Sequence, residues 1–259
     1  MSALKNKFAP SVEALDQRAM MSCTVAASLG HLTVTGDSGN DQVTIRDNGR
    51  GMVTVAATGA ATQTFSGIHH ITVNTEDGDD NVTYTMHGNL VTTQYVLVGL
   101  GSTYCVNGGG NDTFRATLLN GIDILNGGRL DIIADGGGGD DFLSVTAIGV
   151  DVQQGGILKS QLAGGTGRDT LQQYFNGLDN GAVVMRSHGG DEHDNIWQSM
   201  TFAAGSVGQT AGWVTGGDGD DSLSLFMNTQ AGMFIAQADL IGGNGVDGFM
   251  STPNVNVVQ

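Results

Sequence analysis

Residues 214–226 read VTGGDGDDSLSLF, a stretch that places three glycines and three aspartates in six consecutive positions and then alternates serine with leucine. Glycine tolerates the backbone angles of a tight turn, and an apolar residue at every second position is typical of a strand with one buried face. The stretch therefore predicts an acidic turn that leads directly into a β-strand. It also raises the question of what offsets so much like charge in one turn.

Related turns occur along most of the chain, and each ends on an aspartate that directly precedes an alternating segment. Successive copies are 39 residues apart at the start of the chain and 25 to 28 residues apart after Asp141. A repeat of this length is the signature of a solenoid or of another repeat architecture. The eight final aspartates, here called the anchor aspartates, are Asp41, Asp80, Asp112, Asp141, Asp169, Asp194, Asp221 and Asp247.

Each repeat contains two or three short apolar segments of three to five residues, such as LSVTA, AVVM and ADLI. Strands this short cannot bury a core alone, so we expect neighbouring repeats to pair in parallel. The predicted fold is an all-β parallel β-helix, or solenoid, of about eight coils. A propeller is the competing architecture, but a blade needs roughly 40 residues, and only the first interval approaches that.

Two regions follow from the pattern: an N-terminal segment over residues 1–30 and the β-helix with its Gly/Asp-rich turns over residues 31–259. Residues 11–22 predict the one helix, because Ser11 can cap it and Val12, Leu15 and Ala19 fall on one face. We expect this helix to cover the open N-terminal end of the solenoid, where unpaired backbone would otherwise be exposed.

Composition narrows the possible partners. The 259 residues include 42 glycines and 2 prolines, and 26 acidic against 10 basic side chains give a net charge of -16. Such a charge disfavours binding to nucleic acid or to an anionic membrane and favours a cation. The sequence contains no run of 18 apolar residues, so it does not predict a membrane-spanning helix. Cys23 and Cys105 can form one disulfide or remain two thiols, and the sequence leaves both open.

The turn pattern Gly-Gly-x-Gly-x-Asp-x-apolar is complete at residues 136–141, 164–169, 216–221 and 242–247. It resembles the nonapeptide of RTX (repeats-in-toxin), or hemolysin-type, calcium-binding proteins. The resemblance implies Ca²⁺ bound by the anchor aspartates and a secreted protein. This chain departs from the family in having one such turn per long coil instead of one every nine residues. The alternative is that each aspartate only hydrogen-bonds backbone N–H groups of its turn.

A second resemblance lies at the N-terminus. Leu15, Asp16, Gln17, Arg18, Ala19, Met20 and Met21 occupy the places of the Leu-Glu-Pro-Arg-x-Leu-Leu segment that opens many bacterial surface proteins, with departures at Asp16 and Gln17. It implies an extracellular or cell-surface bacterial protein.

Enzymatic chemistry has one candidate segment, SHGGDEHDNIW at residues 187–197. A carbohydrate-active β-helix would use clustered carboxylates with a basic residue; the alternatives are a transition-metal site or a degenerate turn with solvated histidines. The candidates are Arg186, His188, Asp191, Glu192, His193, Asp194 and Trp197. Tyr174, Phe175 and Trp197 are the place to look for a sugar-stacking surface. His31, His69 and His70 are interpreted as surface residues, and Arg46, Arg115 and Arg168 as balancing the acidic turns.

These observations favour a calcium-associated, non-enzymatic, structural or adhesive solenoid module outside the bacterial cell. The alternative function is a β-helical carbohydrate-active enzyme, either a polysaccharide lyase or a hydrolase. Besides calcium, the predicted partners are extracellular polysaccharide and a second copy of the chain. The second copy would pair through the C-terminal coil, where NVNVVQ at residues 254–259 alternates and carries no charged side chain.

Overall fold

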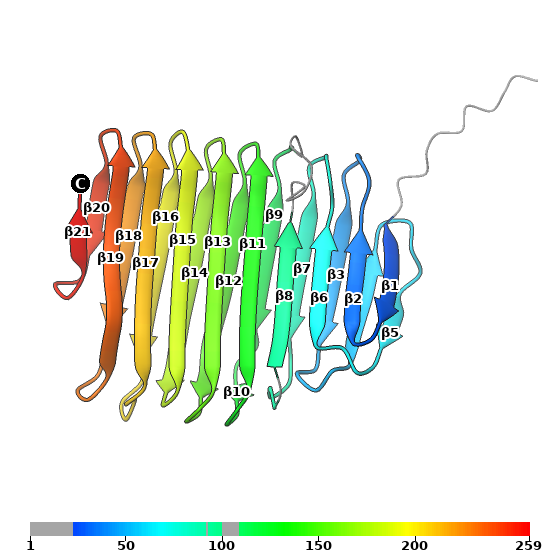
Figure 1. Cartoon of the computed structure of the whole chain (residues 1–259), viewed down its shortest axis with the longest axis horizontal. Coiled ribbons are helices and arrows are strands. Elements are labelled where there is room, and N and C mark those ends of the chain that lie inside the picture. The colour runs from blue at the N-terminus through cyan, green and yellow to red at the C-terminus, as the bar shows by residue number, and fades with distance from the viewer. Residues whose placement is uncertain (1–22, 92, 100–108) are drawn as a thin grey trace, which may run out of the picture.

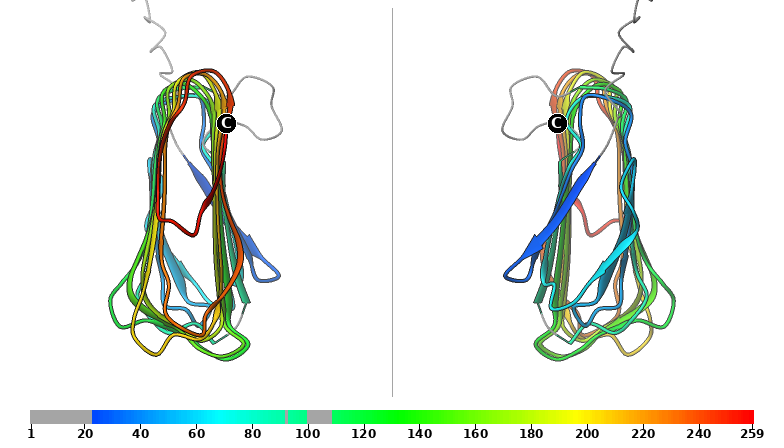
Figure 2. Two further views of the ribbon diagram at one scale, coloured as in Figure 1. Left: turned by 90° about the vertical axis from the view of Figure 1, so that its left-hand side faces the viewer. Right: turned by 90° about the vertical axis from the view of Figure 1, so that its right-hand side faces the viewer.

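The computed structural model describes residues 23–91, 93–99 and 109–259, and these residues form 21 strands and no helix. The strands make two sheets that face each other across a narrow interior (Figures 1 and 2). In spatial order, the first sheet contains β1 (Thr24–Ser28), β2 (His31–Thr35), β6 (His70–Asn74), β8 (Thr93–Gly99), β11 (Arg129–Gly138), β13 (Ile157–Thr166), β15 (Ala182–Asp191), β17 (Gln209–Asp218), β19 (Phe234–Asn244) and β21 (Asn256–Val258).

The second sheet has eleven strands, ten of them in one continuous order. That order is β20 (Gly248–Ser251), β18 (Ser222–Asn228), β16 (Asn195–Phe202), β14 (Thr170–Asp179), β12 (Phe142–Val152), β9 (Thr113–Leu118), β7 (Asn81–Met86), β3 (Gln42–Asp47), β4 (Val53–Ala57) and β5 (Gln63–Phe65). The remaining strand, β10 (Asp123–Ile124), pairs with β12 in parallel.

The predicted parallel β-solenoid is confirmed. Each coil places one strand in the first sheet, crosses an acidic turn and places the next strand in the second sheet, so that strands two apart in sequence pair in parallel (Figure 1). The regular coils number five, from β11 to β20. This corrects the predicted count of about eight, because the strands of the three N-terminal repeats are shorter, and the first repeat carries an inserted antiparallel meander.

Strand lengths differ from the prediction in the C-terminal half. Strands β12 and β19 each span 11 residues, where three to five were expected. The reason is that segments interpreted as separate strands continue into one another: both FIAQ and ADLI lie within β19. In the first repeat they do remain separate, since β3, β4 and β5 form an antiparallel meander that explains its extra length.

The N-terminal end of the described solenoid is formed by β1, which pairs antiparallel with β2 (Figure 1). This strand lies within the segment assigned to residues 1–30. The predicted helix at residues 11–22 and Cys105 lie outside the described residues.

Alternate residues of both sheets point into the interior and stack on the equivalent residues of the next coil. One such row runs from Leu143 through Leu171 and Ile196 to Leu223, and each of these side chains is at most 1% exposed. Burying an aliphatic side chain of this size contributes about 1.5–3 kcal/mol. The interior is therefore a continuous apolar core that neighbouring coils build together, as expected for short repeats.

Polar side chains interrupt this core in the middle coils. Gln173 and Gln198 are fully buried and lie side by side on β14 and β16. The Gln173 amide donates to the Ser187 hydroxyl at 2.8 Å, and Ser160 donates to the Gln173 carbonyl oxygen. The Gln198 amide donates to the Met185 carbonyl at 3.2 Å. This network joins the two sheets across the interior by hydrogen bonds.

Candidate functional site

The acidic turns line one edge of the solenoid, where the chain passes from the first sheet to the second. Seven of the eight anchor aspartates are at most 3% exposed, and Asp247, in the last coil, is half-buried. The anchors therefore point into the molecule and not into solvent. The sequence predicted their place in the turns and left open whether they bind Ca²⁺ or only hydrogen-bond backbone N–H groups.

Each anchor is joined to the next by one hydrogen bond. The backbone N–H of Asp141 donates to Oδ1 of Asp169 at 2.8 Å, and the N–H of Asp169 donates to Oδ1 of Asp194 at 2.8 Å. The same bond, 2.7–3.0 Å long, joins all seven successive pairs from Asp41 to Asp247. The anchors thus form a ladder, here called the aspartate ladder, in which each carboxylate satisfies a buried amide of the preceding coil.

Among the described residues no coil precedes the first rung, and Cys23 takes that place. Its thiol donates to Oδ1 of Asp41 at 3.2 Å, while Oδ2 of Asp41 accepts the N–H of Asp37 at 2.9 Å. Burial, followed by this contact with Asp41, raises the pKa of the Cys23 thiol to about 12. The thiol is therefore protonated near neutral pH and acts as a hydrogen-bond donor at the end of the ladder.

The other carboxylate oxygen of the anchors is enclosed. Oδ2 of Asp169 is buried and accepts no hydrogen bond, and the same holds for Asp112, Asp141, Asp194 and Asp221. Oδ2 lies against the glycine five residues earlier: a methyl group added to Gly164 would be 2.2 Å from Oδ2 of Asp169 and 2.6 Å from the Gly189 carbonyl oxygen. Glycine is required here because any side chain would occupy the space of the carboxylate.

This environment favours the neutral carboxyl group. Burial raises the pKa of Asp141, Asp169 and Asp194 to about 7, and the hydrogen bond from the preceding amide opposes the rise only in part. The pKa rises for the same reason to about 7 in Asp80 and about 8 in Asp112, with neighbouring carboxylates adding to it. A protonated Oδ2 can donate a hydrogen bond, which an ionised one cannot.

A second ladder runs through the residues just before the anchors, in the opposite direction. The N–H of Asn111 donates to Oδ1 of Asp79 at 2.8 Å, and the N–H of Asp140 donates to Oδ1 of Asn111 at 2.8 Å. Arg168 continues it by donating its N–H to Oδ1 of Asp140, and its guanidinium lies 3.5 Å from Oδ2 of Asp140. The expected charge-balancing role of Arg168 is thus confirmed.

Ca²⁺ takes six to eight oxygen ligands from carboxylates and carbonyls. In the aspartate ladder Oδ1 already accepts a backbone N–H, and Oδ2 of Asp112, Asp141, Asp169, Asp194 and Asp221 is buried. Across the part of the chain that the structure describes, no group of three or more His, Cys, Asp or Glu side chains is placed to hold a metal ion. These donors do not fit a calcium shell. The sequence-based prediction of Ca²⁺ at the eight anchors is not tested by the structure, and on this geometry we expect stability to be independent of Ca²⁺.

The segment SHGGDEHDNIW does not form one cluster. His188 lies on the outer face of the first sheet, Asp194 is buried in the aspartate ladder and Trp197 lies on the outer face of the second sheet. His193 belongs to the second ladder, where its Nδ1 accepts the N–H of Asp220 at 2.8 Å. His188, Asp194 and Trp197 thus lie on three different surfaces, so these three cannot act together on one substrate group.

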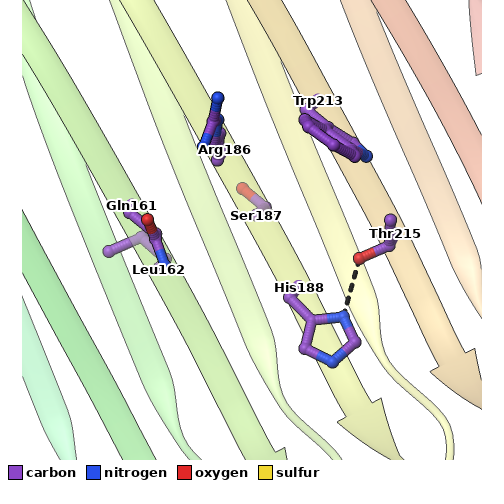
Figure 3. Close-up of a pocket in the computed structure, with 7 residues that line it drawn as sticks. All are labelled: Gln161, Leu162, Arg186, Ser187, His188, Trp213 and Thr215. Atoms are coloured by element: carbon purple, nitrogen blue, oxygen red, sulfur yellow. Dashed lines mark hydrogen bonds between the residues drawn. The ribbon is translucent and has the colours of Figure 1, made fainter.

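A hollow of about 220 Å³ lies on the outer face of the first sheet, over β13, β15 and β17 (Figure 3). Gln161, Arg186 and Trp213 are direct neighbours in the strand register, and His188 and Thr215 follow two residues further along. The Arg186 guanidinium lies 5.2 Å from the centre of the Trp213 ring, and His188 Nδ1 lies 2.6 Å from the Thr215 hydroxyl.

The proposed sugar-stacking residues divide between two surfaces. Tyr174 and Trp197 form a stacked pair outside the second sheet, with ring centres 5.9 Å apart and ring planes 7° apart. Phe175 points inward and packs on Phe202 in the core. Gln161 and Trp213 were not predicted, because only the strand register brings residues 25 and 27 positions away side by side with Arg186. The spacing of the anchors carries that register.

The fold and the acidic edge together define an acidic parallel β-solenoid, in which two ladders of hydrogen bonds join successive turns. In comparisons with protein-family models, with curated proteins and with solved structures, no match was found. Among the described residues, no helix is long and apolar enough to cross a membrane.

Proposed function

We propose that this chain is a non-enzymatic structural or adhesive module at the bacterial exterior. The observation that carries the proposal is the use of its buried carboxylates: the anchor aspartates hold one coil to the next and are withdrawn from solvent. Their regular spacing along the whole edge is the pattern of a load-sharing scaffold, and it leaves two outer sheet faces for contacts.

The runner-up function is a β-helical lyase or hydrolase of polysaccharides. Such an enzyme needs an acid and a base close enough to act on one glycosidic bond or one sugar. The division of His188, Asp194 and Trp197 among three surfaces argues for the non-enzymatic function. The acidic net charge and the RTX-like turns support an extracellular setting.

Two experiments test this function. Surface proteolysis of intact producing cells, followed by fractionation, should find the chain outside the cytoplasm, and retention in the cytoplasmic fraction would refute the proposed setting. Incubation of the purified chain with a panel of polysaccharides should release neither reducing ends nor unsaturated uronates. Release of either product, lost in an Asp191→Asn or His188→Ala variant, would establish the enzyme instead.

A further inference from the structure

We propose that the hollow formed by Gln161, Arg186, His188, Trp213 and Thr215 binds the carboxylate of an acidic sugar, a uronate unit of an extracellular polysaccharide. The inference extends the proposed adhesive role by naming the surface and the chemistry of its ligand. It rests on the side chains that line the hollow and on how they are held (Figure 3).

Arg186 supplies the charge. The described residues give it no ion pair, although the chain carries a net charge of -16, whereas Arg129 and Arg168 each pair with an aspartate. Its guanidinium is instead held over the Trp213 ring. A guanidinium matches a carboxylate with two parallel hydrogen bonds, and a side chain that is already ordered loses less entropy on binding.

The remaining side chains suit the ring and hydroxyl groups of a sugar. Gln161, His188 and Thr215 provide amide, imidazole and hydroxyl groups on three adjacent strands, and Trp213 adds an aromatic surface. Gln161 and Trp213 are two strand spacings apart, about 10 Å, which is the scale of one or two pyranose rings. Hydrogen bonds from the Gln161 amide and the Thr215 hydroxyl to sugar hydroxyl groups would distinguish a sugar acid from a simple anion, which lacks those groups.

Phosphate-rich polymers fit this surface less well. Nucleic-acid sites use several cationic side chains along the backbone, but here Arg186 stands with one further cation nearby, Lys159, two residues before Gln161 on the same face of β13. Acidic groups adjoin the hollow as well: Asp239 is the register neighbour of Trp213, and its carboxylate accepts hydrogen bonds from Gln237 and Asn256. The negative potential of these acidic groups repels a ligand with one charge per sugar less than it repels a dense polyanion.

The test uses Trp213 as its own reporter. The chain has two tryptophans, so a Trp197→Phe background leaves the fluorescence of Trp213 alone. Titration with trigalacturonate should change this fluorescence and saturate, and calorimetry should give the same affinity. The methyl ester of the same trisaccharide, which has no charge, should bind at least about tenfold more weakly.

Arg186→Gln should weaken trigalacturonate binding by about tenfold or more, and Gln161→Ala by a smaller factor. The matched control is Arg115→Gln, because Arg115 also lies over an aromatic ring, that of Phe142 at 4.6 Å, but outside the second sheet. Thermal melting of each variant checks that it folds. Gln161→Ala retains the guanidinium and keeps the test valid if Arg186→Gln does not fold.

Equal binding of the acid and its ester, or an equal effect of Arg186→Gln and Arg115→Gln, would overturn the inference. So would binding of inorganic phosphate or sulfate as tight as that of trigalacturonate, which would indicate an anion site without sugar recognition. The absence of any saturable signal would overturn it too. None of these outcomes bears on whether the chain is exported, so the proposed function is tested separately.

Discussion

Asp169 shows how one residue joins its own coil to both neighbouring coils. Its Oδ1 accepts the amide of Asp141, its own amide donates to Asp194, and its Oδ2 fills the space that Gly164 leaves open. Burial raises the pKa of Asp80, Asp112, Asp141, Asp169 and Asp194 to about 7 or 8, so the like charge that the sequence concentrates in each turn is reduced at these anchors near neutral pH. The charges that remain lie at the exposed positions of the turn.

Replacing Asp169 by Asn should preserve stability at pH 8, because the amide carbonyl keeps the bond from Asp141 and the NH₂ group can donate where Oδ2 lies. Replacing it by Ala should cost about 1–3 kcal/mol of unfolding free energy, because the Asp141 amide loses its partner. Urea denaturation measures both. Asp77→Asn, which removes an exposed charge, is the control, and an Asp169→Ala variant as stable as this control would show that the ladder bond is dispensable.

Gly216 tests the space beside the ladder. An added methyl group would lie 2.0 Å from Oδ2 of Asp221 and 2.7 Å from the Gly242 carbonyl oxygen. Gly216→Ala should therefore lower the unfolding free energy by about 1–3 kcal/mol or more through overpacking. Gly248→Ala should have little effect, since its nearest neighbour would be 3.7 Å away. Similar melting temperatures for the two variants would contradict this account of the glycines.

At the scale of the strand, the buried glutamines are the feature that joins the two sheets. Gln173→Leu would leave Ser160 and Ser187 without this partner in the interior, so it should destabilise by about 1–3 kcal/mol. Gln172→Leu changes the neighbouring residue, which is exposed on the other face of β14, and should be nearly neutral. Denaturant unfolding compares the two variants. An unchanged unfolding free energy for Gln173→Leu would show that the hydrogen-bond network does not stabilise the fold.

Alternation and anchor spacing predicted most of the strands, as in β12, where Leu143, Val145 and Ala147 point inward as the pattern requires. They did not identify Gln173 as a core residue, because a polar residue at an inward position gives no apolar signal and its partners on β13 and β15 are not visible in the sequence. They failed also at Trp213 and Gln161, because the hollow depends on side chains from three coils. Short-range patterns carry the period of a solenoid but not the contacts between its faces.

At the scale of the whole molecule, the C-terminal coil ends in exposed strands. Met250 is 64% exposed, Val257 and Val258 are each 42% exposed, and β21 pairs with β19 on one side. We expect this edge to pair with a second copy, as the sequence predicted, because an unpaired strand edge is a template for another strand. Val257→Lys should then shift sedimentation toward the monomer. A wild-type chain that stays monomeric at high concentration would contradict the expectation.

The aspartate ladder takes up protons when the chain folds. Acidification from pH 8 to pH 5 should therefore stabilise the protein, which is the opposite of ordinary acid denaturation. A group whose folded pKa is raised stabilises fully below its unfolded pKa, here near 3.8, and the stabilisation is lost as pH rises through the folded pKa, here about 7 to 8. Between pH 5 and pH 8 the folded chain therefore binds more protons than the unfolded chain. His70, whose burial lowers its pKa, opposes this with one group against several.

The measurement is the melting temperature at pH 5, 6, 7 and 8, each in Ca²⁺ and in chelator. The predicted result is a melting temperature that rises steadily from pH 8 to pH 5 and is the same with and without Ca²⁺ at each pH, with a shallower slope for Asp169→Asn. A melting temperature that falls on acidification would contradict the account and show that the anchors are ionised in the folded chain. A melting temperature at pH 8 that depends on Ca²⁺ and not on Mg²⁺ would contradict it too, and would show that the anchors work as ionised metal ligands.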